Sequence, residues 1–245
     1  MPWRQTTSPS WGSPTARWET ESRRDEALEA WKQRLSGVAA FYPRSRSPRS
    51  AHTDSRSHAS LGTVLEVSPR IVKELQRQIH GKLSLFVSLL SIFQVLLHKC
   101  IASRSLVVLI PVSRRGFHVG ASKTMGNMAY TAAIGSEVDF ENDTFAAVDH
   151  RTESFVAFAR GNSFVPVDKA LGAISSNVRE QSIMFVFSRA AVHDDCPQVS
   201  DVPDDVLPLA PAMVDLTINV VERGDELSIS AAYDRGKYDA NFMEG

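Results

Sequence analysis

The 245-residue sequence predicts an α/β fold in which helices cover a mixed sheet. Residues 106–110 read Leu-Val-Val-Leu-Ile without polar alternation, which is typical of a strand buried on both faces. Just before this run, residues 84–101 have the length and pattern of a long amphipathic helix. Residues 214–221 and 227–232 predict a hairpin around Arg223-Gly224-Asp225. A buried strand after a helix, together with a late hairpin, indicates a mixed sheet.

The elements between these landmarks follow from helix-start signals and apolar spacing. Ser68-Pro69 supplies a capping hydroxyl and then Pro at the first helical position, and Gly81 ends this predicted helix. Ser84 and Asp143 are the predicted caps of two further helices. The remaining predicted elements are a helix over 25–35, strands over 61–67, 128–134 and 183–187, and a short helix over 166–171.

The helix over 84–101 has two different sides. Its predicted buried side consists of Leu85, Leu89, Phe93, Leu96 and Leu97. A polar side consists of Ser84, Ser88, Ser91, Gln94 and His98, which a lipid-facing span would not carry. We expect His98 on this polar side, and His80 at a helix end, to be solvated or capping groups.

Composition excludes several function classes. A hydrophobic content of 43% is sufficient for one buried core, and a net charge of −1 gives no general attraction to nucleic acid or anionic membrane. Cys100 and Cys196 are too few and too far apart for a disulfide framework or a zinc site, so we expect a reducing, cytoplasmic setting. Residues 1–13 lack the apolar core of a secretory signal. We therefore expect a soluble protein with no metal site and no nucleic-acid or membrane partner.

The predicted organisation is a flexible N-terminal segment, residues 1–24, followed by one domain, residues 25–245. Within that domain, residues 43–58 form a basic low-complexity loop rich in Ser, Arg and Pro, which cannot pack a core. A solvated linker is a better interpretation than a nucleic-acid patch, because no aromatic residue lies between the charges.

Few residues form a recognisable catalytic pattern. Residues 116–124 resemble a phosphate loop only faintly, because two residues separate Gly120 from Lys123 where the motif needs Lys directly after Gly. There is no Gly-x-Ser-x-Gly nucleophile elbow, and no His has metal-ligand spacing to another His or Cys. Asp194-Asp195 and Asp204-Asp205 lie in a Pro-rich loop, which favours a solvated turn over a metal site.

Short motifs nevertheless occur in a characteristic order. They are Ala30-Trp31 with Leu35-Ser36-Gly37, Leu83-Ser84-Leu85-Phe86, Pro111-Val112-Ser113-Arg114-Arg115, residues 125–131 (Met-Gly-Asn-Met-Ala-Tyr-Thr), Pro166-Val167-Asp168, Met184-Phe185-Val186-Phe187, Asp215-Leu216 and Tyr233. In this order the chain resembles the C-terminal half of the condensation domains of nonribosomal peptide synthetases. These domains belong to the chloramphenicol-acetyltransferase-like, CoA-dependent acyltransferase superfamily.

The resemblance implies a fold and a function. The implied fold is a chloramphenicol-acetyltransferase-like sandwich, of which the chain supplies only the C-terminal subdomain. The family forms amide bonds between thioesters on carrier proteins in secondary-metabolite biosynthesis. Carrier protein domains are therefore the implied partners, with phosphopantetheine-linked thioesters as their cargo and no cofactor bound directly. This half would form one wall of the tunnel and lend a segment within 189–212 to the other half.

The motif positions implied to shape the tunnel or the structure are Arg115, Gly126, Asn127, Thr131, Pro166, Asp168 and Asp215. We expect Arg115 to form a structural ion pair at the strand end in preference to contacting substrate. Gly126 and Asn127 are expected to form a tight turn, for which Gly supplies backbone freedom. Thr131 and Pro166 are expected to be architectural.

The catalytic motif of the family, His-His-x-x-x-Asp-Gly, is absent, since no His is followed by Asp four residues later. Acyl transfer needs a positioned base. We therefore expect no catalytic residue here and no activity from the chain alone, with the motif supplied by a missing N-terminal half or a partner chain. Further departures are Leu109 for Gly, Tyr130 for Asn, and Asn162-Ser163-Phe164 for His-Gln-Asp.

Two other functions stay open from the sequence. One is a divergent acyltransferase of the alcohol- or lipid-acylating branch, with His118 or His193 as the base. The other is a non-catalytic module that docks a carrier protein or completes a partner's fold, which predicts an exposed apolar face. The chain is expected to be a short protein, a fragment of a synthetase, or the product of an incorrectly assigned start.

Overall fold

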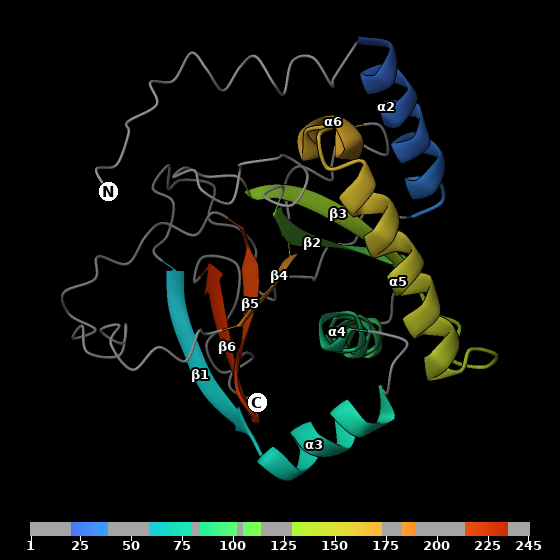
Figure 1. The fold of residues 1–245 in the computed structure, drawn as a ribbon. Helices are drawn as coiled ribbons and strands as arrows, with labels where there is room; N and C mark the ends of the chain where they lie inside the picture. The colour runs from blue at the N-terminus through green and yellow to red at the C-terminus, as the bar shows by residue number, and fades with distance from the viewer. Residues whose placement is uncertain are drawn as a thin grey trace, which may run out of the picture.

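A computed structural model describes residues 21–38, 59–79, 84–101, 105–113, 129–172, 183–189 and 214–234 of the chain. Five helices and six strands lie in these ranges (Figure 1). The helices are α2 (Glu21–Leu35), α3 (Pro69–Gln78), α4 (Leu85–Ile101), α5 (Phe145–Gly161) and α6 (Val167–Gly172). The strands are β1 (Ala59–Val67), β2 (Ser105–Ser113), β3 (Ala129–Glu137), β4 (Ile183–Arg189), β5 (Leu216–Arg223) and β6 (Glu226–Asp234).

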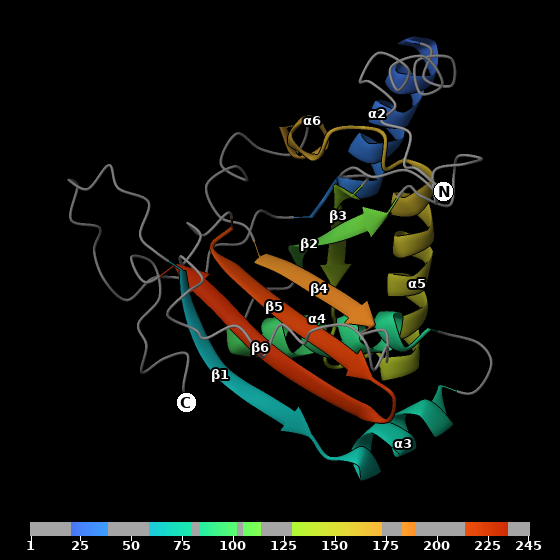
Figure 2. The ribbon, with the colours of Figure 1, turned by 60° about the vertical axis from the view of Figure 1, so that its left-hand side comes forward.

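The six strands form one mixed sheet, which confirms the predicted fold class. Their order is β1-β6-β5-β4-β2-β3, with β4 parallel to both β2 and β5 and the other neighbours antiparallel. Figure 2 shows this twisted sheet with α4 behind it and α5 beside β3. The predicted hairpin is confirmed, because β5 and β6 pair around a turn in which Gly224 has φ of 60°.

Strand β2 lies inside the sheet, between β3 and β4, as its unbroken apolar run predicted. One face of the strand is fully buried at Leu106, Val108 and Ile110. The other face is covered as well, since Leu109 is 7% exposed. A strand with apolar groups on both sides is stable only when both faces are packed, and this explains the sequence pattern.

Helix α4 presents its polar side to the interior. Ser88, Ser91, Gln94 and His98 are each no more than 1% exposed. The expected solvation of His98 is therefore wrong, and so is the expected burial of Leu96, which is 55% exposed. Periodicity correctly separated the two sides of the helix, but it carried no information about which side α5 would cover.

Hydrogen bonds with α5 and β3 compensate the burial of this polar side. The carboxylate of Asp149 on α5 accepts from the hydroxyl of Ser88 at 3.0 Å and from that of Ser91 at 2.7 Å. Thr152 Oγ1 donates to Gln94 Oε1 at 2.8 Å. At the end of the helix, His98 Nε2 lies 3.1 Å from Ser136 Oγ on β3. We call these side chains the α4 polar seam.

The aromatic side chain of Trp31 attaches α2 to α5. The indole is 1% exposed, and its Nε1 donates to the carbonyl of Asn162 at 3.1 Å. Its ring meets that of Phe158 edge-on at 4.9 Å between centroids, and Arg34 lies 4.9 Å over the ring of Phe155. The predicted helix over 25–35 is thus confirmed, although it begins earlier, at Glu21.

Helix starts agree with prediction only in part. Ser84 acts as the expected cap, since its Oγ accepts from Val87 N at 3.3 Å. Ser68 occupies the cap position before Pro69, but its side chain makes no capping hydrogen bond. Thr144, not Asp143, caps α5 by accepting from Ala147 N at 3.3 Å. The carboxylate of Asp143 is used elsewhere, as described below.

The basic loop over 43–58 and the Pro-rich loop over 194–211 lie outside the described residues. Among the helices in the described ranges, none combines the length and the apolar character that a membrane span requires.

Substitution of Gly135 by Ala should destabilise the fold. A Cβ at this position of β3 would lie 3.0 Å from Val38 Cγ2 and 3.1 Å from Phe155 Cε2. We expect a loss of about 1–3 kcal/mol in the free energy of unfolding, measured by urea titration, because overpacking a close contact has this cost. Gly161→Ala is the matched control, because no atom lies within 4 Å of its added Cβ. Equal stability of Gly135→Ala and the parent would contradict the close packing of α2 and α5 on β3.

A double-mutant cycle on Thr152 and Gln94 should reveal the α4 polar seam. Thr152→Val leaves Gln94 Oε1 without its donor, and we expect a loss of about 1–3 kcal/mol in unfolding free energy. Gln94 Nε2 is buried and has no partner among the described residues. The double variant Gln94→Leu/Thr152→Val should therefore recover part of this loss, because both polar groups are removed together. Strict additivity of the two single effects would argue against a coupled pair.

Candidate functional site

Three of the sequence-predicted site residues, Arg115, Gly126 and Asn127, lie outside the described residues. The strand ends on either side of them are described, and they are adjacent, because Ser113 of β2 pairs with Ala129 of β3. Thr131 is half-buried in β3, opposite Pro111. In sequence, these three residues lie between the end of β2 and the start of β3, which are neighbours in the sheet.

The other predicted positions lie elsewhere in the fold. Pro166 precedes α6, and its carbonyl accepts from the backbone N–H groups of Lys169 and Ala170 at 3.1 Å each. Asp168 is exposed in the first turn of that helix. Asp215 is 8% exposed just before β5, and its carbonyl accepts from Asp234 N at 2.9 Å. Each of these carbonyl contacts serves local backbone structure.

The structure does not bring Thr131 and Asp215 together. Strands β2, β4 and β5 run parallel, but β4 and β5 begin level with the middle of β2, because Met184 pairs with Leu109 and Leu216 pairs with Ile183. Asp215 lies just before β5, whereas Thr131 lies on β3 and pairs with Pro111 near the carboxyl end of β2. Strands β4 and β2 separate the two residues, which therefore do not form one cluster.

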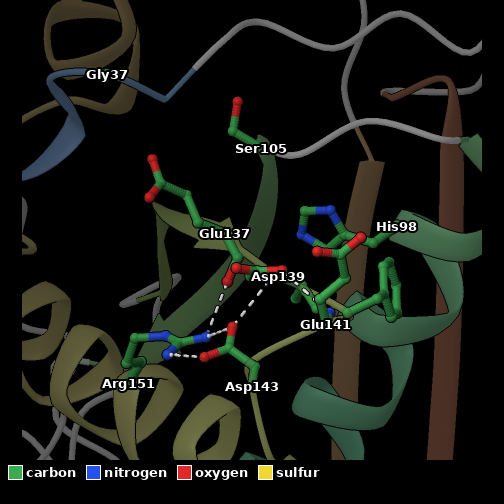
Figure 3. A pocket seen from close by; sticks show the side chains of 10 residues that line it. Gly37, His98, Ser105, Glu137, Asp139, Glu141, Asp143 and Arg151 are labelled. Carbon is green, nitrogen blue, oxygen red and sulfur yellow. Dashed lines mark hydrogen bonds and ion pairs between the residues drawn. The ribbon is translucent and has the colours of Figure 1, made fainter.

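A cavity of about 640 Å³ lies at the amino end of β2 (Figure 3). Its lining residues are Gly37, His98, Ser105, Glu137, Val138, Asp139, Phe140, Glu141, Asp143 and Arg151. They come from the end of α2, the end of α4, the start of β2, the end of β3, the β3–α5 loop and α5. The cavity is consequently the point at which five described elements converge.

Charged hydrogen bonds fix the β3–α5 loop along one side of this cavity. The guanidinium of Arg151 binds both carboxylate oxygens of Asp143, and its Nη2 also donates to the carbonyl of Glu137 at 3.1 Å (Figure 3). Asp139 accepts from the backbone N–H of Glu141 at 3.0 Å and from Asn142 Nδ2 at 2.7 Å. We call this arrangement the Arg151 clasp.

The clasp perturbs the acid–base properties of its members. Hydrogen bonds from Arg151 and then from the backbone of Asp139 lower the pKa of Asp143 to about 2. The same partnership raises the pKa of Arg151. The hydrogen bond from Asn142 is the main cause that lowers the pKa of Asp139. These groups are therefore held in their charged forms at neutral pH, which suits ion pairing and not proton transfer.

Among the described residues that line the cavity, the one histidine is not placed to act as a general base. His98 reaches its wall, but the ring is 1% exposed and its Nε2 is engaged with Ser136. His150 is exposed on α5, 3.7 Å from Glu153. Among the described residues no group of three metal-ligating side chains gathers. The Arg151 clasp can hold the β3–α5 loop in place, and its ion-paired side chains do not point to a reaction.

Sequence reasoning missed the Arg151 clasp. The available signal was the acidic run Asp139–Asp143 followed, two turns into a helix, by a single Arg. Such an acidic run is usually solvated. Its pairing with Arg151 could not be predicted, because it depends on the path of the β3–α5 loop.

Comparison with known proteins gave fold relatives only. No protein-family model matches the sequence, and no curated protein matches it. Among solved structures, a four-domain nonribosomal peptide synthetase superposes with a TM-score of 0.75 and 20% identity, over 94% of this chain and 19% of that one. The X-domain from teicoplanin biosynthesis, solved in complex with OxyB, gives a TM-score of 0.69 and 15% identity.

A third similar structure is the epimerization domain from the third module of tyrocidine synthetase B, with a TM-score of 0.67 and 13% identity over 98% of this chain. The chain spans 51% of the X-domain structure and 56% of the epimerization-domain structure. The described residues therefore have the fold of condensation domains, which is chloramphenicol-acetyltransferase-like, and the chain accounts for about half the length of such a domain. This confirms the fold that the motif order predicted.

Removal of the Asp143 carboxylate should reduce acid sensitivity. Its pKa is lowered from 3.8 to about 2 in the folded protein, so the ion pair stabilises the fold above about pH 4 and is lost as the pH falls towards 2. We expect Asp143→Asn to lower the Tm at pH 7 but to flatten the decline of Tm between pH 4 and pH 2. Asp168→Asn, which removes an exposed carboxylate from α6, is the control. Parallel pH profiles for parent and Asp143→Asn would exclude this role.

Proposed function

We propose that the chain is part of a condensation domain of the nonribosomal peptide synthetase type, namely the half that lacks the catalytic histidine motif. The condensation-domain fold over 94% of the chain is the observation that supports this proposal most directly. The order of the motifs from Trp31 to Tyr233 supports it independently, because it follows the C-terminal half of the family. Related domains form amide bonds between thioesters on carrier proteins, and we assign carrier protein domains as partners of this chain.

The chemistry of condensation explains why this half would be inactive alone. An amine must attack a thioester carbonyl, and the reaction needs a positioned base or dipole at the nucleophile. No His in the sequence has the spacing of the family motif. His98 is buried as part of the α4 polar seam. The proposed contribution of this chain is a wall that receives phosphopantetheine arms, with the base supplied by another segment.

A non-catalytic docking role is the second candidate. One of the structures with this fold was solved as a complex of the X-domain with OxyB, so a domain of this shape binds another protein in that case. The exposed apolar side chains of Ile92 and Leu96, four residues apart on α4, are consistent with a protein-binding surface here. This candidate shares the fold of the first and differs only in the absence of acyl transfer after the domain is completed.

An acyl-transfer assay separates these possibilities. The purified chain, incubated with carrier-bound donor and acceptor thioesters, should form no amide product detectable by mass spectrometry. The same chain joined to the histidine-bearing half of a condensation domain should form product if the first candidate is correct. Turnover by the chain alone would refute the proposal. In that event the activity of His118→Ala and His193→Ala would be measured, and loss of activity in one of them would identify the base of a divergent acyltransferase. Both histidines lie outside the described residues.

A further inference from the structure

Strand β1 forms one edge of the sheet. It pairs with β6 on its inner side, and no described strand pairs with its outer side. Figure 1 and Figure 2 both place β1 at one margin of the sheet, away from β3 at the other. An edge strand presents unpaired backbone N–H and C=O groups, which are a template for pairing with a further strand.

The two edges of the sheet differ in their cover. Helices α5 and α6 both contact the edge strand β3. Helix α3 follows β1 directly, but it turns inward and contacts β6 (Figure 1). Covering an edge with a helix is one way in which proteins prevent pairing with other chains. The helix next to β1 therefore does not shield its outer side.

The side chains of β1 are exposed on both faces. Val64 is 49% exposed and Leu65 is 61% exposed. They pair with Ser230 and Ile229 of β6, and as neighbours in a strand they point to opposite faces of the sheet. Glu66 is the single charged residue of the strand. This part of β1 is therefore an apolar strand that water reaches from both sides.

A protective irregularity lies before this exposed part. The register with β6 shifts between Leu61 and Val64, and a bulge of this kind bends an edge away from further pairing. From Val64 to Val67 the register is regular, and Pro69 comes only in the first turn of α3. Residues 64–67 consequently keep a regular edge. We call them the β1 edge.

We propose that the β1 edge pairs with the β1 edge of a second copy of this chain, antiparallel and across a two-fold axis. Both copies then contribute the same surface, as in most homodimers, and two six-stranded sheets become continuous. The strand of the second copy is already ordered by its own pairing with β6. A free extended peptide would first lose the entropy of its backbone, so it is a poorer occupant.

The side chains favour one register for this pairing. A two-fold axis at Leu65 places each Leu65 opposite its own copy and Glu66 opposite Val64 of the second copy. An axis at Glu66 would place two carboxylates directly opposite each other, which is destabilising. An axis at Val64 would extend the pairing into the bulge, and one at Val67 would include Pro69, which has no N–H to donate. Leu65 is therefore the centre of the proposed interface.

The proposed interface is small. A standard interface buries about 800 Å² from each partner, whereas a strand segment as short as the β1 edge is only about 13 Å long. We therefore expect a reversible dimer that dissociates on dilution. This inference goes beyond the proposed function and does not depend on it, because no carrier protein and no acyl transfer are involved.

Sedimentation equilibrium of the full chain tests the proposal. Between about 1 µM and about 1 mM, the mean mass should rise from 27.0 kDa towards that of a dimer. Leu65→Lys places two ammonium groups opposite each other, and we expect it to raise the dissociation constant at least about tenfold, which corresponds to 1.4 kcal/mol. Leu96→Lys is the matched control, because Leu96 is 55% exposed on α4 and its change should leave the dissociation constant unaltered.

Three results would overturn the proposal. One is a parent chain that stays monomeric at about 1 mM. The second is a dimer that Leu96→Lys weakens and Leu65→Lys does not, because its interface would then lie on α4. The third is a large fall in the Tm of Leu65→Lys at about 1 µM, where we expect the parent to be monomeric. The Leu65 side chain already faces water, so such a fall would mean that another segment of the same chain covers it.

Oxidative cross-linking tests the register separately. Leu65→Cys and Glu66→Cys are each placed in a Cys100→Ser/Cys196→Ser background. Directly opposite residues of antiparallel strands have Cα atoms about 4.5–5.5 Å apart, within the range of a disulfide. Mild oxidation should therefore give a covalent dimer from Leu65→Cys. Glu66→Cys is the control and should cross-link at least about tenfold more slowly, because its copies would lie diagonally, about 7–8 Å apart. Equal rates at both positions, or no cross-link at position 65, would contradict the proposed pairing.

Discussion

The burial of polar side chains on α4 is the constraint on which the rest of the described structure depends. Asp149 is 5% exposed and accepts from two serine hydroxyls, so α5 can approach α4 in one register only. A buried carboxylate that lost these donors would carry a large desolvation cost. The hydrogen bonds therefore set the position of α5 and, through His98 and Ser136, the relation of α4 to the edge strand β3.

The remaining packing follows from the position of α5. Its aromatic rings receive Trp31 of α2, and Gly135 on β3 leaves room for Phe155 and Val38 because it has no Cβ. The Arg151 clasp then ties the start of α5 to the end of β3 through the carboxylate of Asp143 and the carbonyl of Glu137. Helix α5 thus contacts α4, α2 and the end of β3, and these contacts position the elements around it.

The described residues form a scaffold. The described part of the chain has a condensation-domain fold and a well-packed sheet, and its charged cluster serves a loop. Of the predicted motif positions, Thr131 on β3 and Asp215 before β5 are separated by strands β2 and β4. The described side chains of the charged cluster therefore serve packing and loop geometry.

The sequence by itself determined the element order, the mixed sheet, the buried strand β2 and the family likeness, because these depend on local period and motif order. It predicted Ser84 as a cap correctly, whereas Asp143 proved to be an ion-pair partner and Thr144 the cap. It also divided α4 into two sides but assigned His98 to solvent and Leu96 to the core, both wrongly. Only the tertiary structure decided these points. The side of a helix that is buried depends on the hydrogen-bond partners that distant segments offer, and Asp149, Thr152 and Ser136 meet α4 only in the folded chain.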